Sequence, residues 1–161
     1  MVVIGIFIVI ALVLFAGAFL SRRRFGLLGL ALAAGATVST IWSYDAGLLL
    51  AATGLVPEGP ITNAITLAAI VLLPALLLLF HGYAYKNMAA RIIGSLFFTI
   101  LALAFLVEPI GIALPLEGVG AQAYEWLKLN KELIISVGLV FAVIDLFFTK
   151  PVKNDEKSHK K

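Results

Sequence analysis

Long apolar runs alternate along this chain with short stretches of charged and turn-forming residues. A helix of about 20 apolar residues crosses the roughly 30 Å hydrocarbon core of a bilayer. The pattern therefore predicts an all-α fold, a polytopic membrane helix bundle with about five transmembrane helices. We expect them at Val2–Leu20, Phe25–Trp42, Ile61–Phe80, Ile92–Val107 and Leu133–Thr149.

Three further stretches have other patterns. Ala46–Val56 is apolar but too short to span, so it is expected to form an interfacial or re-entrant helix. Gly120–Glu132 mixes aromatic, aliphatic and charged residues, which predicts an amphipathic helix on the membrane surface. Pro151–Lys161 is charged and is expected to be a disordered basic tail. Residues 1–150 are thus expected to form a single transmembrane domain.

The composition excludes an ordinary soluble domain. Apolar residues make up 62% of the chain and charged residues 13%, whereas soluble domains carry about 25% charged residues. Too few polar residues remain to cover a surface that faces water. No Lys or Arg precedes Val2–Leu20, so we interpret this run as a retained anchor and not as a cleaved signal.

The basic residues predict an orientation. If five helices span, one side receives ten of the twelve Lys and Arg residues and the other receives Lys128 and Lys131. Because basic residues concentrate in cytoplasmic connections, we expect the N-terminus outside and the C-terminus in the cytoplasm, in the plasma (inner) membrane. The residues that set this topology and contact lipid headgroups are expected to be Arg22, Arg23, Arg24, Lys86 and Arg91.

Small residues and one proline predict how the helices pack. Small side chains spaced by four share a helix face and let backbones approach closely. Gly29, Ala33 and Thr37 are spaced by four, as are Ala31, Gly35 and Ser39, and Gly94 is a further packing position. Packing within the bundle is the first interpretation, and a homo-oligomer interface is the alternative. Pro74 predicts a kink in its helix, either a static bend or a hinge.

Two ionisable residues could handle protons or ions. Asp145 lies near the end of the last apolar run, and a charge in a membrane helix usually faces the bundle or water. The simpler interpretation is an interfacial carboxylate paired with Lys150 or the tail. His81 ends the third run and is either an interfacial residue or part of a proton relay.

The chain shows no pattern typical of an enzyme. It contains no cysteine and two distant histidines, so no metal site is expected. A Gly-rich phosphate loop and a nucleophile motif are both missing, and no cofactor is expected. The basic clusters are explained by topology, so nucleic acid is not an expected partner. Membrane lipids, further copies of this chain and other membrane proteins are the expected partners.

The layout resembles the colicin V production protein family, CvpA, over roughly Val2–Val107. Arg22-Arg23-Arg24-Phe25-Gly26 resembles the Arg-Gly-Phe element after the first helix of that family, with the order changed. Arg91-Ile92-Ile93-Gly94 resembles its Arg-x-x-Gly element. The resemblance implies a small bacterial inner-membrane protein linked to export of a peptide toxin and to envelope homeostasis, and it brings no catalytic residue.

Two functions are therefore expected. The first is a non-enzymatic integral membrane scaffold or accessory protein. The alternative is a small oligomeric transporter or channel that uses Asp145. The scarcity of polar groups inside the predicted helices favours the first, since transporters usually carry polar groups or broken helices near the midplane.

Overall fold

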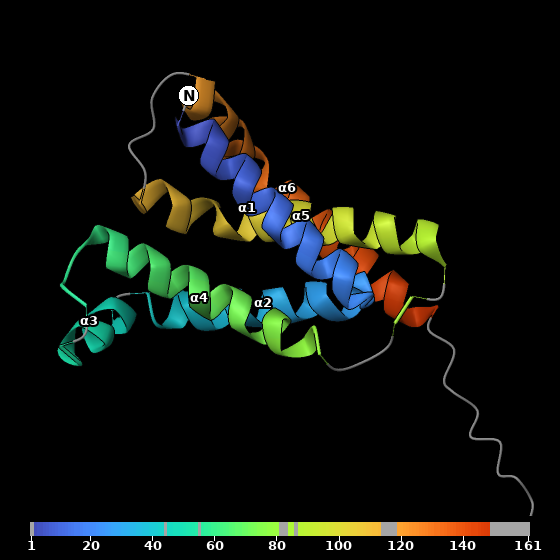
Figure 1. The fold of residues 1–161 in the computed structure, drawn as a ribbon, viewed down its shortest axis with the longest axis horizontal. Coiled ribbons are helices and arrows are strands. Elements are labelled where there is room, and N and C mark those ends of the chain that lie inside the picture. Colours follow the sequence, from blue (N-terminus) through green and yellow to red (C-terminus); the bar gives the residue numbers. More distant parts are fainter. Residues whose placement is uncertain are drawn as a thin grey trace, which may run out of the picture.

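A computed structural model shows how the helices are arranged (Figure 1). It describes residues 2–43, 45–54, 56–80, 84–85, 87–113 and 119–148. This part of the chain holds six helices and no strand, and its one β-bridge joins Arg23 to Ala84. The all-α fold is confirmed. The helices are α1 (Val2–Ser21), α2 (Phe25–Ile41), α3 (Asp45–Ala52), α4 (Pro60–Leu78), α5 (Met88–Ala113) and α6 (Val119–Phe147).

Three helices are long and apolar enough to cross a membrane: α1, α4 and α5. Helices α2 and α3 pass the same test together but are bent by 79° where they meet, and they make a fourth span if they are counted as one. Helix α6 is long but carries charged residues through its first half. The membrane character of the bundle follows from these helices, whereas the number of five spans stays a prediction.

Two predicted helix ends are wrong. The helix expected to end at Val107 continues to Ala113, and Pro109 within it is buried in the bundle, so tertiary packing outweighs the lost hydrogen bond and the steric cost of a proline in a helix. Gly120–Glu132 and Leu133–Thr149 form a single helix, α6, and not a surface helix followed by a span. Lys131 and Glu132 at the expected junction are good helix formers, so nothing interrupts the helix there.

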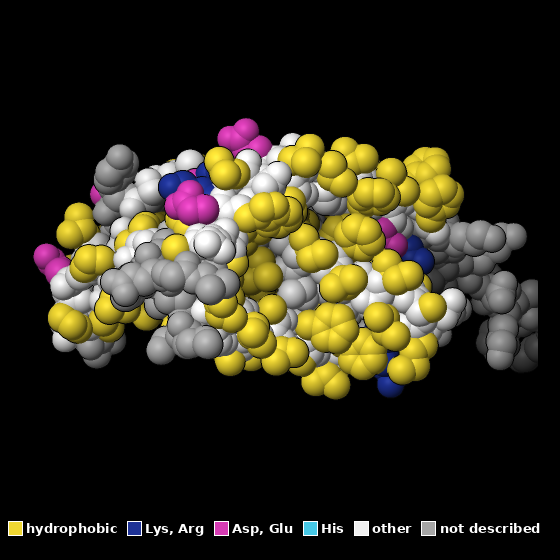
Figure 2. All heavy atoms as spheres, turned by 90° about the horizontal axis from the view of Figure 1, so that it is seen from above, with side chains coloured by type: hydrophobic (Ala, Val, Ile, Leu, Met, Phe, Trp, Pro, Cys, Tyr) yellow, Lys and Arg dark blue, Asp and Glu magenta, His cyan; other side chains and the backbone are white. Residues whose placement is uncertain are grey.

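Helix α5 is the centre of the bundle. Half of the residues in its apolar, membrane-length stretch are buried in the bundle (50%). The corresponding share for α1, which packs on the outside, is 6%. In Figure 1, α2 and α4 run side by side while α1 and α6 slope across the bundle. The tightest part of the core joins Leu28 and Leu32 of α2 to Leu101 and Ala102 of α5. Figure 2 shows hydrophobic side chains over the middle of one face and charged side chains toward its two ends.

Glycines let α2 pack closely against its neighbours. A Cβ on Gly35 would collide with the carbonyl oxygen of Val71 and lie 2.9 Å from that of Ile70, both in α4. Pro74 has no N–H to donate to the Ile70 carbonyl, and Gly35 packs close to this carbonyl. Gly29 packs on Ala142 of α6, while Ala33 is half-buried. These glycine contacts lie within one chain.

We predict that Gly35→Ala destabilises the protein by roughly 1–3 kcal/mol, the usual cost of overpacking a core. The added methyl group meets backbone, which cannot move aside as a flexible side chain can. Gly17→Ala is the control, because nothing lies within 4 Å of a Cβ at that position. Unfolding in mild detergent by added denaturant measures both variants, and equal stability of the two would contradict the close contact between α2 and α4.

Candidate functional site

Helix α2 begins where α6 ends, and each helix supplies partners for the other. The Nη1 atom of Arg24, the residue before α2, donates to the backbone oxygen of Asp145 at 3.0 Å and lies 3.9 Å from its Oδ1. The Oδ2 of Asp145 accepts the backbone N–H of Gly26 at 2.9 Å. The carboxylate therefore caps the positive end of α2, and the guanidinium caps the negative end of α6. We call this set of contacts the reciprocal cap.

Tyr85 completes the reciprocal cap from the segment between α4 and α5. Its hydroxyl accepts the backbone N–H of Phe25 at 3.0 Å, and its own N–H donates to the Arg22 oxygen at 2.8 Å. The Arg24 guanidinium lies 5.5 Å from the centre of its ring. The ring rests on Gly94 of α5, where a Cβ would lie 2.6 Å from the ring edge. Burial raises the pKa of Tyr85 to about 12, helped by the charge of Asp145 and a hydrogen bond with it.

Two more arginines cap helices at the same end of the bundle. Arg23 donates from Nε to the Leu79 oxygen at 3.0 Å and from Nη2 to the Phe80 oxygen at 2.8 Å, at the end of α4. Arg91 donates to the Phe19 oxygen at the end of α1, and its guanidinium lies 3.7 Å from the centre of the Phe19 ring. Cations at helix C-termini are stabilising. We call the end of the bundle where Arg23, Arg24 and Arg91 lie the arginine end.

The arginine end brings several predicted site residues together and changes their roles. Asp145 meets Arg24 of the first connection, and its predicted partners, Lys150 and the tail, lie outside the described residues. Arg22 is exposed, and its backbone has a left-handed φ of 59° in the turn between α1 and α2. Lipid contact alone therefore does not account for Arg23, Arg24 and Arg91. His81, Lys86 and residues 149–161 lie outside the described residues.

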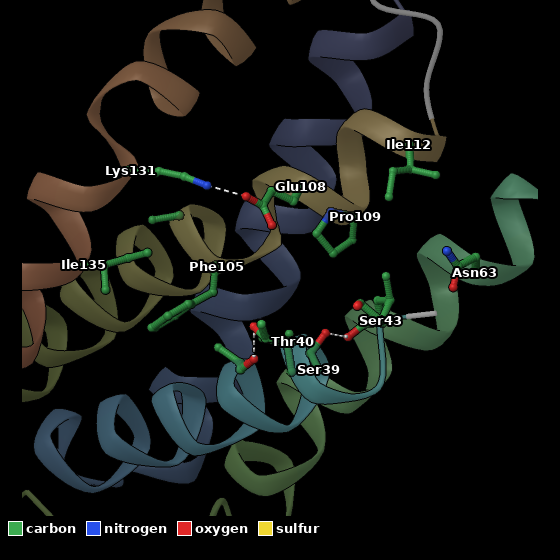
Figure 3. A pocket seen from close by; sticks show the side chains of 14 residues that line it. Ser39, Thr40, Ser43, Asn63, Phe105, Glu108, Pro109, Ile112, Lys131 and Ile135 are labelled. Atoms are coloured by element: carbon green, nitrogen blue, oxygen red, sulfur yellow. Dashed lines mark hydrogen bonds and ion pairs between the residues drawn. The ribbon is translucent and has the colours of Figure 1, made fainter. Parts of the chain in front are cut away.

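A cavity of about 690 Å³ opens between the helices at the opposite end, which we call the cavity end (Figure 3). One wall comes from α2, the turn after it and α4, and the other from α5 and α6. Lys131 of α6 and Glu108 of α5 form an ion pair at its edge. The lining residues are Ala36, Ser39, Thr40, Ser43, Asn63, Leu67, Val71, Ala104, Phe105, Glu108, Pro109, Ile112, Lys131 and Ile135.

Sequence reasoning missed this cavity. It placed Glu108 just beyond the helix expected to end at Val107 and Lys131 in a surface helix, so nothing indicated that they meet. A weak signal existed in Ser39, Thr40 and Ser43, which cluster near the end of an apolar run. Asn63 is a further polar residue near the start of α4, and its Oδ1 is buried with no hydrogen-bond partner among the described residues.

A solid apolar layer separates the two ends of the bundle. Leu32 and Leu101 are almost fully buried, and Phe98 is 4% exposed beside them. The buried hydroxyls of Ser95 and Thr99 donate to carbonyl oxygens of their own helix, each at 2.8 Å. Within the described ranges, no group of three or more His, Asp or Glu side chains is placed to hold a metal ion.

Comparisons with protein-family models, characterised proteins and solved structures find no match for this chain. The resemblance to the colicin V production proteins stays a prediction.

We predict that Asp145→Ala destabilises the protein by roughly 1–3 kcal/mol, because it leaves the Gly26 N–H without its acceptor and removes the carboxylate beside Arg24. Asp145→Asn should cost less, since an amide oxygen still accepts from Gly26. Asp45→Ala, at an exposed position in α3, is the control. Thermal unfolding in detergent ranks the variants, and a loss no larger for Asp145→Ala than for Asp45→Ala would argue against the reciprocal cap.

The raised pKa of Tyr85 predicts a loss of stability at high pH. Its pKa of about 12 in the folded protein lies above the ordinary value of 10.0, so the protonated form is favoured by folding. The resulting stability is fully present below about pH 10 and is lost as pH rises toward 12. An ultraviolet titration of tyrosinate should show one late group that disappears in Tyr85→Phe. A titration unchanged by that substitution would contradict the burial of the phenol.

Proposed function

We propose that this chain is a non-enzymatic integral membrane protein with a scaffold or accessory role. The observation that carries the proposal is that the carboxylate of Asp145 is engaged in contacts between helices. Its carboxylate accepts from Gly26 and lies beside Arg24 and Tyr85, so it joins helices in the way a structural residue does. A proton-handling carboxylate instead has to exchange its partners during each cycle.

The apolar layer supports the same proposal over a channel or transporter. Asp145 lies at the arginine end and the cavity lies at the other, with Leu32, Phe98 and Leu101 packed between them. An ion would have to cross this layer without a polar partner, which is costly in a medium of low dielectric constant. The hydroxyls of Ser95 and Thr99 within it are already bonded to their own helix.

The distribution of charge supports a particular orientation of the protein in the membrane. Arg22, Arg23, Arg24 and Arg91 all lie at the arginine end, which we assign to the cytoplasm of the plasma membrane by the positive-inside rule. The cavity end, which carries Glu108 among other acidic residues, then faces outward.

Helix α1 is the surface that best suits an accessory role. Its outward face carries Ile8, Val9, Leu12 and Val13, each more than half exposed. Such a face is suited to lipid or to an apolar helix of another membrane protein, including a second copy of this chain. Peptide-toxin export and envelope homeostasis are the settings that the CvpA resemblance suggests for it.

A flux assay separates the scaffold from the transporter. Purified protein in liposomes with an enclosed pH-sensitive dye should pass protons, sodium and potassium no faster than empty liposomes do. The Asp145→Asn variant should behave in the same way as the original protein. A flux that appears with the original protein and is lost in Asp145→Asn would overturn the scaffold proposal.

A further inference from the structure

Polarity changes with depth in the cavity at the cavity end. Ser43, Thr40 and Asn63 lie near the mouth, at the end of α2 and the start of α4. Ala36 and Val71 lie further along the same helices and are apolar. From Asn63 to Val71 the helix rises about 12 Å at 1.5 Å per residue. A polar mouth above an apolar chamber fits an amphipathic molecule that enters head outward.

Hydrogen-bond acceptors line the cavity near its mouth. Ser39 uses its hydroxyl proton on the Leu67 oxygen at 3.5 Å, and Thr40 uses its own on the Ala36 oxygen at 3.0 Å. Each hydroxyl oxygen therefore has lone pairs to offer. Pro109 lacks the N–H that would bond the carbonyl of Phe105, and both residues line the cavity. A ligand rich in N–H donors suits this set of acceptors.

The ion pair at the mouth has the charges of a zwitterion. Glu108 and Lys131 lie on facing helices, with side chains 67% and 28% exposed. A ligand with one ammonium and one phosphate can exchange partners with this pair, ammonium to Glu108 and phosphate to Lys131. No charge is then left unpaired, which would be costly at a membrane border. A purely anionic head would leave Glu108 facing a like charge.

We propose that the cavity binds one phospholipid with a primary-ammonium zwitterionic head, its head at the mouth and part of an acyl chain in the apolar chamber. The volume of about 690 Å³ lies within the usual range for ligand sites, roughly 300–1,000 Å³. The inference rests on the proposed membrane function, and it adds a lipid of the outer leaflet as a specific partner.

Native mass spectrometry of the full chain in detergent tests the proposal with two lipids that share their acyl chains. Phosphatidylethanolamine has three N–H donors on its ammonium, and phosphatidylcholine has none. We expect the first to be retained about tenfold more tightly, the scale of a charge-assisted hydrogen bond. Glu108→Gln should reduce this preference to the level of phosphatidylcholine, while Glu125→Gln, at an exposed position of α6 outside the cavity, should not. Ala36→Leu, which fills the chamber, should weaken retention of both lipids.

Equal retention of the two lipids by the original protein would overturn the proposal, and so would a preference that survives Glu108→Gln. If Glu108→Gln fails to fold, the comparison of the two lipids on the original protein still decides. Phosphoethanolamine without chains should not bind. Binding of that compound as tight as that of the lipid would assign the cavity to a small soluble zwitterion and overturn the lipid proposal. The two proposals fail separately. Equal binding of the two lipids without ion flux overturns the lipid proposal and leaves the scaffold proposal standing. Ion flux lost in Asp145→Asn overturns the scaffold proposal and leaves the lipid proposal standing.

Discussion

The reciprocal cap between α2 and α6 is the interaction on which the arginine end depends. Helix ends leave backbone groups without partners, and a membrane offers no water at depth to supply them. Asp145 sits at the negative end of its own helix, where a carboxylate is unfavourable, and it reaches the positive end of another. Arg24 lies at the positive end of α2, where a cation is unfavourable, and it donates to the negative end of α6. The two charges thus stabilise two helix ends at once, and their positions determine where α2 and α6 meet.

The other helix ends at the arginine end follow the same principle. Arg23 caps α4 and Arg91 caps α1, so basic residues that we expect to orient the chain in a membrane also hold its helices together. Tyr85 links the segment between α4 and α5 to this set and rests on Gly94. The predicted orientation and the packing of the helix ends therefore depend on the same side chains.

The cavity end is built in the opposite way. Here the helices separate instead of capping one another, and the mouth is held by the pair of Glu108 and Lys131. The packed layer around Leu32 and Leu101 keeps the two ends independent. The scaffold and lipid proposals rest on this contrast between a capped end and a hollow end with a polar mouth.

The sequence by itself determined the helical class and the number of apolar runs, because lipid as a solvent requires long apolar stretches whose backbone bonds are satisfied internally. It also indicated Asp145 and the small residues of α2 as special positions. It could not show that Asp145 meets Arg24, or that Glu108 meets Lys131, since both pairs join residues far apart in the chain. Helix continuity past Pro109 was likewise decided by tertiary packing, which outweighs the local signal for a helix end. The cavity arises where helices diverge, and divergence depends on which side chains fill the space between them.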